Sequence, residues 1–365
     1  MRVLFNIGHP AHVHLFKNVI WALEKEGYDI KITARDKEIV LHLLDAYGFE
    51  YDVISKKGSG LLGLTKEMII RDYNLLKIAR GFRPDIMVAV LDHAVAHIGK
   101  LLGIPSIIFN DSEPEAIKYP IADIITTPFA STIIVPRSLK HSYGDKEIRI
   151  NSYKELAYLH PNHFKPDFKV IRNAGISKNE KFVLVRFVAW EAHHDISEGG
   201  FSLKHKLQLV KELKEYASVY ISSEFPLPKE LKKYRLPIPP DYIHHFLYYS
   251  NLLVCDSQTM TTEAGILGTP AIRSNSFVGK NDMSNFIELE KRYGLIYNIP
   301  HPEKAIKKAI ELIQQPKTKK IWKKKRESLL REKIDLTSFM VWFIENYPES
   351  FSEIKENPGI QYRVR

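Results

Sequence analysis

The sequence contains a single cysteine, Cys255, among its 365 residues. One thiol cannot form an intramolecular disulfide, so a disulfide-stabilised secreted fold is excluded and a reducing compartment is expected. No apolar run approaches the ~18 residues that a membrane-spanning helix needs. The chain begins MRVLFNIG, which predicts a short buried strand and not a signal peptide. We therefore expect a cytoplasmic protein.

Acidic residues are outnumbered by basic ones, and the formal net charge is +10. This charge suits nucleic acid, phosphorylated substrates or an anionic membrane surface as partners. Because the sequence has no recognised nucleic-acid motif and no interleaved aromatic platform, we expect no specific nucleic-acid partner. The most basic tract is 317–333. It predicts either a solvated helix face or a docking surface for an anionic membrane or another partner.

Short apolar runs alternate with segments of helical periodicity along the chain, and a second alternation begins near residue 180. This pattern predicts parallel sheets with right-handed crossovers. We expect an α/β protein with two facing, Rossmann-like, doubly wound domains and ligands in the cleft between them. The expected parts are an acceptor domain at 1–165, a nucleotide-sugar domain at 166–320, and closing helices and a tail at 321–365.

The most informative stretch is LLVCDSQTMTTEAGILGTPAI (252–272). A strand is expected to end at Asp256, followed by a polar turn and a helix that begins near Thr261. Free N–H groups and the positive end of the helix dipole meet at such a junction. The sequence therefore predicts an anion site here, and a diphosphate fits it.

Polar side chains surround this predicted junction. Ser257, Gln258 and Thr259 add donors, and Glu263 can accept two hydrogen bonds from a ribose diol. The residues alone leave a second interpretation open. Thr262 or the threonine before it would then cap the helix, and Glu263 would only complement the helix dipole.

A second notable stretch is GHPAHVH (8–14), which places three histidines at the start of an expected helix. A neutral imidazole titrates near pH 6.5 and can take up a proton at physiological pH. The histidines could equally cap the helix or fill space. They could also bind one or two metal ions together with two histidines at i and i+4 and one carboxylate. Such a site would suit a metal-dependent hydrolase or deacetylase. That set comprises His9, His12, His14, Asp92, His93 and His97.

The segment DSQTMTTEAGILGTP resembles the nucleotide-sugar signature of GT-B enzymes, and most of all that of the non-hydrolysing UDP-N-acetylglucosamine 2-epimerases. MurG-type transferases have a similar glutamate. The chain departs from the pattern at Gln258 and Thr259, where the family has two glycines. Nearly the whole chain also resembles the DUF354 family, which is grouped with the GT-B superfamily. The matching positions of the signature are Asp256, Ser257, Glu263, Ala264, Leu267, Gly268 and Pro270.

The N-terminus resembles GT-B glycosyltransferases as well, many of which begin with a strand, the triplet G-H-V and a helix. In this register the resemblance implies that His12 is the general base on an acceptor hydroxyl, with His14 as a second choice. The epimerases use a carboxylate at the end of a middle strand, and Asp92 could match it. Gly8 of the same loop is assigned to the nucleotide-sugar contacts.

Further candidates lie in the second half of the chain. Arg186 ends an expected strand and could bind a diphosphate bidentately, or form a salt bridge at the sheet edge. Ser223, with Glu224 beside it, ends the next strand and is a weaker candidate. The GT-B resemblance implies that the nucleotide base is met by Ile243 and His244. The segment HHD at 193–195 is a further candidate for contacts with the sugar.

These features predict a glycosyltransferase that moves a sugar from a nucleotide diphosphate sugar, UDP being favoured, to a hydroxyl acceptor. The resemblance implies polysaccharide or glycolipid assembly, with a lipid-linked acceptor as one option, and no bound metal or other cofactor. The loop 56–66 could touch a lipid-linked or polymeric acceptor, or it could be a flexible surface loop whose leucines pack on a neighbouring helix. A peripheral membrane contact is compatible with the basic tract 317–333. The alternatives are a UDP-sugar 2-epimerase and the metal-dependent hydrolase.

Overall fold

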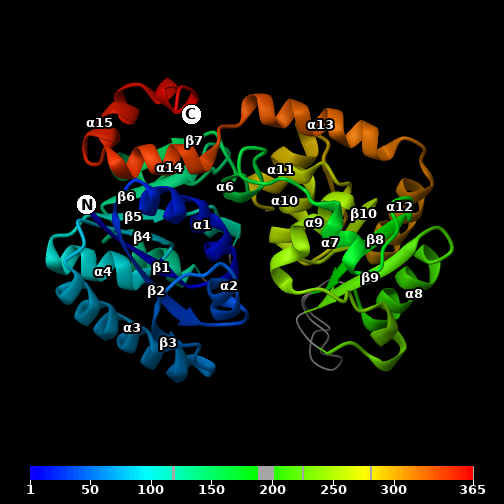
Figure 1. Ribbon diagram of the computed structural model, residues 1–365, viewed down its shortest axis with the longest axis horizontal. Helices are drawn as coiled ribbons and strands as arrows, with labels where there is room; N and C mark the ends of the chain where they lie inside the picture. Colours follow the sequence, from blue (N-terminus) through cyan, green and yellow to red (C-terminus); the bar gives the residue numbers. More distant parts are fainter. Residues whose placement is uncertain (117–119, 188–200, 224–225, 280–281, 365) are drawn as a thin grey trace. The chain divides into compact units, whose positions relative to one another are not determined.

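The computed structural model describes residues 1–116, 120–187, 201–223, 226–279 and 282–364 (Figure 1). The chain forms two compact units. Unit 1 comprises Met1–His163 and Lys333–Arg365, and unit 2 comprises Phe164–Glu332. The expected boundaries were 165 and 320. The structure instead keeps the basic tract almost entirely in unit 2 and returns the chain to unit 1 only from Lys333.

Unit 1 is built on a seven-stranded parallel sheet with the order β3-β2-β1-β4-β5-β6-β7. The order reverses between β1 and β4, which is where parallel α/β sheets bind ligands, at the carboxyl ends of the strands. The strands are β1 (Arg2–Ile7), β2 (Asp29–Asp36), β3 (Asp52–Lys56), β4 (Ile86–Val90), β5 (Ser106–Phe109), β6 (Thr132–Pro136) and β7 (Glu147–Ile150).

Helices pack on this sheet because each carries an apolar stripe at helical spacing. In α1, for example, Val13, Phe16, Val19 and Leu23 are buried. The helices of unit 1 are α1 (Pro10–Lys25), α2 (Val40–Ala46), α3 (Gly60–Phe82), α4 (His93–Leu102), α5 (Ile121–Thr126), α6 (Leu156–Leu159), α14 (Leu336–Glu345) and α15 (Glu349–Glu356), with 3-10 turns η1 (Pro114–Ala116), η2 (Gly144–Lys146) and η5 (Pro358–Tyr362).

The glycine-bearing segment 56–66 is mostly helical, because α3 already begins at Gly60. The chain before it is held by Glu67, which accepts hydrogen bonds from the Gly58 N–H at 2.8 Å and from Arg35. A Cβ on Gly58 would lie only 2.3 Å from the carbonyl oxygen of Gly63. The glycine is therefore required for this close approach, and the nearby leucines belong to a helix.

Unit 2 contains a five-stranded parallel sheet in the order β12-β11-β10-β8-β9, and this order reverses between β10 and β8. Its strands are β8 (Phe182–Phe187), β9 (Ser218–Ser223), β10 (Leu252–Cys255), β11 (Ala271–Arg273) and β12 (Ile296–Asn298). Its helices are α7 (Phe168–Asn173), α8 (Leu203–Leu213), α9 (Ile243–Tyr249), α10 (Gln258–Leu267), α11 (Ser284–Lys291), α12 (Pro302–Gln314) and α13 (Thr318–Glu332), with 3-10 turns η3 (Lys229–Tyr234) and η4 (Pro240–Tyr242). Two Rossmann-like parallel-sheet units thus confirm the predicted α/β class.

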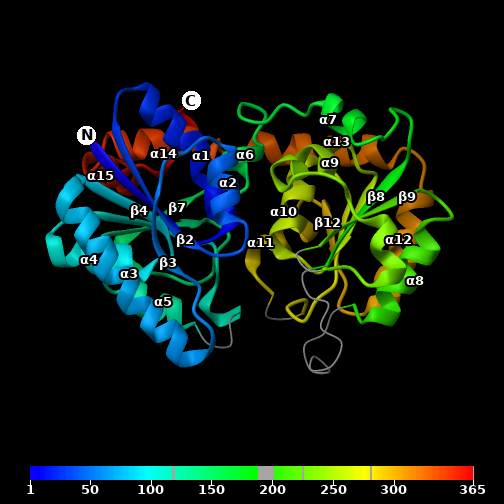
Figure 2. The ribbon, with the colours of Figure 1, turned by 60° about the horizontal axis from the view of Figure 1, so that its bottom comes forward.

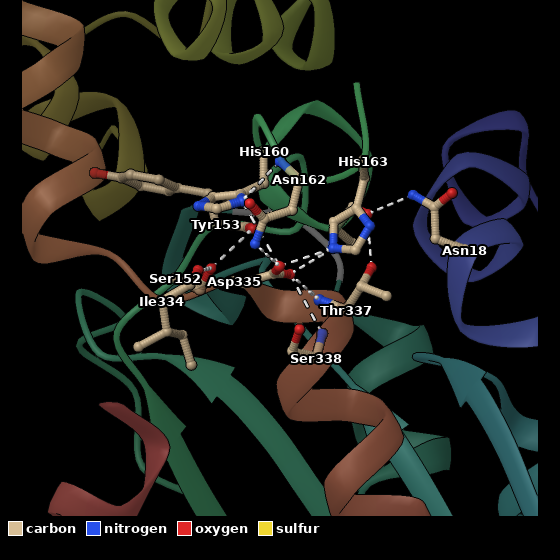
Figure 3. Close-up of polar contacts among 11 residues, drawn as sticks. Asn18, Ser152, Tyr153, His160, Asn162, His163, Ile334, Asp335, Thr337 and Ser338 are labelled. Carbon is tan, nitrogen blue, oxygen red and sulfur yellow. Dashed lines mark hydrogen bonds and ion pairs between the residues drawn. The ribbon is translucent and has the colours of Figure 1, made fainter. Parts of the chain in front are cut away.

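The chain leaves unit 1 and returns to it at a polar cluster centred on Asp335 (Figure 3). Asp335 caps α14 by accepting hydrogen bonds from the N–H groups of Thr337 and Ser338. It also pairs with His163 Nε2, which lies 2.8 Å from both carboxylate oxygens, and accepts from Asn162. The last residues before the exit and the first residues after the return are therefore joined.

Within the described residues, no helix combines the length and the apolar character that crossing a bilayer requires.

Candidate active site

In unit 1, three of the predicted residues meet where the strand order reverses. Gly8 follows β1 and Asp92 follows β4, and these strands are parallel neighbours. The point that a Cβ on Gly8 would occupy lies 3.9 Å from His12 Cε1, 3.9 Å from Asp92 Oδ2 and 3.8 Å from Arg71 Nη2. We call Gly8, His12, Arg71 and Asp92 the unit 1 cluster.

Asp92 has a structural role within this cluster. Its Oδ1 accepts a hydrogen bond from the Val95 N–H at 3.2 Å and so caps α4, and its Oδ2 forms an ion pair with Arg71 Nη2. Burial alone would raise the pKa of Asp92, but the guanidinium of Arg71 and the hydrogen bonds outweigh it and lower the pKa. Asp92 is therefore an ionised carboxylate with a fixed counter-ion.

Sequence reasoning missed Arg71, which comes from the middle of α3. Its side chain is buried, on the same face of the helix as Glu67 and Leu75. Charged residues at i and i+4 on the apolar face of an expected helix are rare unless they have partners. The i, i+4 spacing of Glu67 and Arg71 was the signal in the sequence that could have identified Arg71.

His12 is a neutral imidazole in this environment. Burial lowers its pKa well below 6.5, and the nearby His9 and Lys154 lower it further. The Gly8 N–H donates to His12 Nδ1 over a long 3.4 Å. A neutral imidazole that accepts at Nδ1 carries its proton on Nε2. His12 can therefore take up a proton at Nδ1. It can also take up a proton at Nε2 if its own proton first moves to Nδ1, and that change of tautomer costs only the weak contact with the Gly8 N–H.

The other two histidines of GHPAHVH have different surroundings. His9 is the N-cap of α1, and its Nδ1 accepts from the Ala11 N–H at 3.2 Å. His14 is buried, lies 3.2 Å from the Tyr47 hydroxyl and packs beside Tyr158. Residues two apart on a helix point to nearly opposite sides, so His14 does not join the unit 1 cluster. A catalytic role for His14 stays a prediction.

The metal-site alternative required these histidines to converge with those of α4. Instead, His97 Nδ1 lies 3.0 Å from Asp72 Oδ2 and its Nε2 lies 2.9 Å from the Ile125 carbonyl, while His93 also faces Asp72. Among the described residues, no group of three or more His, Cys, Asp or Glu side chains is arranged to hold a metal ion. The arrangement on which the hydrolase alternative depended is absent from this part of the chain.

A small cavity of about 20 Å³, room for about one water molecule, lies at the carboxyl ends of β4 to β7 in unit 1. Its polar lining comprises Asn110, Ser152 and the ion pair of Lys154 and Asp111, whose charged atoms lie 2.7 Å apart. Val90, which lines the cavity, ends β4 two residues before Asp92 of the unit 1 cluster, and Lys154 is one of the cations that lower the pKa of His12. The apolar part of the lining comprises Leu15, Val90, Phe109, Ile134, Pro136, Ile150 and Leu336.

In unit 2, the predicted junction lies at the carboxyl ends of β8, β9 and β10. Arg186 pairs in register with Ser222 and Cys255, and its Nη1 donates to the Ser222 hydroxyl at 2.9 Å. The Asp256 N–H donates to the Arg186 carbonyl at 3.3 Å. The guanidinium thus belongs to the strand beside the one that leads into α10. Ser223 ends β9 opposite Phe187.

Helix α10 begins at Gln258, three residues before the expected start at Thr261. Ser257 is the N-cap, and its hydroxyl accepts from the Met260 N–H at 3.4 Å. The interpretation in which Thr261 or Thr262 caps the helix is therefore wrong. Because the first N–H groups of a helix have no intrahelical acceptor, those of Gln258 and Thr259 point out of its start. Ser257 gives its oxygen to the cap, and the backbone supplies the donors.

Glu263 and His244, both predicted contacts, form a buried pair. His244 Nε2 lies 2.9 Å from Glu263 Oε1, and the two residues are only 3% and 5% exposed. The pair joins α10 to α9, the helix that begins at Ile243. A ribose contact at Glu263 and base contacts at Ile243 and His244 stay predictions. Glu224 and the segment 193–195 lie outside the described residues.

Residues 1–345 match the protein family described as "Protein of unknown function (DUF354)". The chain belongs to the DUF354 family. An uncharacterized protein of Methanocaldococcus jannaschii is 24% identical to this DUF354 chain over 284 residues, which cover 74% of this chain and 80% of the relative.

The structure of this DUF354 protein is similar to those of two groups of enzymes. The UDP-GlcNAc 2-epimerase of Neisseria meningitidis bound to UDP-GlcNAc has a TM-score of 0.64, at 15% identity, covering 95% of this chain and all (100%) of that one. The spinosyn rhamnosyltransferase SpnG complexed with thymidine diphosphate has a TM-score of 0.62, at the same 15% identity and the same coverage. These likenesses show the fold, which is the predicted GT-B type with two Rossmann-like domains.

Proposed function

We propose that this protein transfers a sugar from a nucleotide diphosphate sugar, UDP being favoured, to a hydroxyl acceptor. The observation that carries the proposal is the start of α10. There the N–H groups of Gln258 and Thr259 lie at the positive end of the helix dipole, one strand away from the guanidinium of Arg186. These groups complement the charge of a diphosphate. Structures of the same fold with UDP-GlcNAc and with thymidine diphosphate support this ligand class.

The unit 1 cluster would serve the acceptor. The hydroxyl oxygen of the acceptor would attack the anomeric carbon of the sugar as the bond from that carbon to the diphosphate oxygen breaks. The hydroxyl proton would pass to the neutral imidazole of His12, which its lowered pKa keeps unprotonated. The helix start and Arg186 would offset the charge of the departing nucleoside diphosphate. Polysaccharide or glycolipid assembly, with a lipid-linked acceptor as one option, stays the expected setting of this reaction.

The backbone donor at Gln258 can be tested by a substitution that removes one N–H. Gln258 is the first residue of α10, where proline is well tolerated, and Ser257 before it has φ −77° and ψ 133°, which a following proline accepts. We expect Gln258→Pro to fold normally and to lose most of the thermal stabilisation that a UDP-, GDP-, CDP-, ADP- or dTDP-sugar gives the wild type. Gln258→Ala, which keeps the N–H, is the matched control and should retain most of it.

Equal stabilisation of Gln258→Pro and wild type by the same nucleotide sugar would remove the helix start from the binding site. If none of the five nucleotide sugars stabilises the wild-type protein, the proposed donor class is wrong. For the acceptor half, His12→Ala should keep the nucleotide-sugar stabilisation and lose transfer. Full transfer activity in His12→Ala would end the assignment of the base.

A UDP-sugar 2-epimerase is the second candidate, and one observation favours it. Asp92 follows β4, the middle strand of the seven, and lies in the same cluster as His12, so a carboxylate and an imidazole are together at the switch point. An epimerase would convert its nucleotide sugar without any acceptor. Proton NMR of UDP-GlcNAc incubated with the protein alone separates the two functions, because without an acceptor a transferase leaves UDP-GlcNAc unchanged, whereas a 2-epimerase inverts the sugar at C2.

A further inference from the structure

The solvent-facing side of α3 is unusual for a helix of a water-soluble domain. At 3.6 residues per turn, seven of its residues fall within an arc of about 100° and extend over about 27 Å of the helix. We call these seven residues the outer stripe of α3. They are Leu62, Lys66, Ile69, Ile70, Tyr73, Lys77 and Arg80, and all of them are exposed.

Large apolar side chains dominate the stripe. Leu62 is 87% exposed, Ile69 and Tyr73 are each 67% exposed, and Ile70 is 39% exposed. Single exposed apolar residues are ordinary, but several along one helix face indicate an interaction surface.

The charge of the stripe has one sign. Its charged residues are Lys66, Lys77 and Arg80, and all three are basic. The acidic residues of α3 point elsewhere, because Glu67 is buried against Arg35 and Asp72 pairs with His97. A solvated helix face normally mixes both signs. Basic residues interspersed with exposed apolar ones are instead typical of a helix that lies on an anionic lipid surface.

A second exposed apolar group borders the same region. His97 of α4 contacts Asp72 of α3 through Nδ1 and the Ile125 carbonyl of α5 through Nε2, so a single imidazole joins the two outer helices. Beside Ile125, Ile121 and Ile124 are 55% and 63% exposed. Figure 2 shows α3 and α4 side by side in unit 1.

The basic tract 317–333 differs from the outer stripe of α3 in its contacts and in its apolar content. In α13 three of the basic side chains are used within unit 2, where Lys319, Lys325 and Arg326 donate to backbone carbonyls of neighbouring segments. Ile321 is the only large apolar residue of α13 with an exposure as high as 36% among the described residues. The tract 317–333 is thus partly a packing element and lacks the apolar component.

We propose that the outer stripe of α3 docks this protein on the surface of an anionic phospholipid bilayer. The isoleucines, Leu62 and Tyr73 enter the boundary between headgroups and acyl chains, and the lysines and Arg80 lie at the lipid phosphates. The opposite side of α3 carries Arg71 of the unit 1 cluster, so one helix would place that cluster near the membrane. The inference depends on this surface alone and holds for any reaction at the cluster.

Co-sedimentation with sucrose-loaded vesicles tests the proposal. The wild-type protein should bind vesicles of phosphatidylcholine mixed with phosphatidylglycerol, bind them less at high salt, and bind pure phosphatidylcholine weakly. The double variant Ile69→Ser/Tyr73→Ser should bind at least about tenfold less. Ile321→Ser/Tyr216→Ser removes the same two residue types from exposed positions of unit 2 and should bind like wild type.

The charged half is tested by a second matched pair. Lys66→Gln/Lys77→Gln should weaken binding to the anionic vesicles, whereas Lys320→Gln/Lys323→Gln on α13 should leave it nearly unchanged. Unchanged melting temperatures establish that all four variants fold. The nucleotide-sugar stabilisation described above is measured in parallel and should be the same in all of them, so failure of the membrane proposal and failure of the proposed function are separate results.

Three results would overturn the proposal. The first is a wild-type protein that does not bind anionic vesicles. The second is equal loss of binding in the α3 and the unit 2 variants. The third is a change in sedimentation coefficient of Ile69→Ser/Tyr73→Ser with vesicle binding intact, which would make the stripe an interface between copies of the chain.

Discussion

The three histidines of GHPAHVH occupy three different environments in unit 1. His9 caps a helix, His12 lies in the unit 1 cluster, and His14 packs against tyrosines. The sequence identifies this stretch, because so many imidazoles at a strand–helix junction are uncommon. It could not separate their roles, since the direction of each side chain depends on where α1 begins.

At His12, the lowered pKa predicts a dependence of stability on pH. In the unfolded chain a histidine titrates near 6.5, whereas folded His12 stays neutral to a much lower pH. As the pH falls below 6.5 the unfolded state binds the proton first, so the free energy of unfolding decreases. One such group contributes about 1.4 kcal/mol of this loss at pH 5.5. Urea unfolding at pH 7.5 and 5.5 should therefore show a smaller loss for His12→Asn than for wild type. Equal losses would contradict the neutral state.

The ion pair of Arg71 and Asp92 predicts a strong asymmetry between single and double substitutions. Both side chains are buried, so Arg71→Ala leaves a carboxylate without its counter-ion and should destabilise the protein by about 3–5 kcal/mol. Arg71→Met with Asp92→Asn removes both charges, keeps a residue that can cap α4, and should recover much of that loss. The measurement is urea unfolding at pH 7.5. A single variant within about 1 kcal/mol of wild type would place the pair in contact with water.

At the scale of elements, the sequence predicts well whether a segment is a helix or a strand, and less well where each element begins and ends. Periodicity identifies the helix after β10, but the start near Thr261 was wrong because Ser257, Gln258 and Thr259 suggested a polar turn. Three polar residues in a row are equally compatible with a cap and a first turn. For α3, the glycines suggested a loop as far as residue 66, although Gly58 is there for a close backbone contact.

Helix α14 depends on a cap that is also an ion pair. Burial alone would raise the pKa of Asp335, but hydrogen bonds and charge from His163 and its neighbours lower it to about 2. The stabilisation is therefore complete above the unfolded value of 3.8 and is lost as the pH falls from about 4 to 2. It amounts to about 2 kcal/mol.

Asp335→Ala should lose this amount at pH 7 and differ much less from wild type near pH 2. Asp335→Asn still caps the helix and lacks the charge, so it should fall between the two at pH 7. The free energy of unfolding in urea is measured across this pH range. A constant difference between wild type and Asp335→Ala over the whole range would show that the ion pair contributes nothing.

For the whole molecule, alternating strands and helices were enough to predict two parallel-sheet units. The place where the chain returns to unit 1 was not predictable from composition, because 317–333 and the helices after it have no boundary of Pro or Gly between them. The return is fixed by long-range contacts. Asp335 meets His163, and the Ser152 hydroxyl donates to the Ile334 carbonyl at 3.0 Å.

This discontinuous unit 1 predicts different effects of two truncations. Helix α14 packs against α1 and α6, and buries Leu336, Phe339, Met340, Phe343 and Ile344. A chain that ends at Glu332 loses all of these residues, so unit 1 should lose its cooperative thermal transition. Unit 2 is continuous from Phe164 to Glu332 and should keep its own transition and its stabilisation by a nucleotide sugar.

A chain that ends at Asn346 retains α14 and should keep both transitions, with unit 1 less stable because α15 is gone. Calorimetry and circular dichroism resolve the cases. A chain ending at Glu332 with two intact transitions would mean that unit 1 folds without its C-terminal helices.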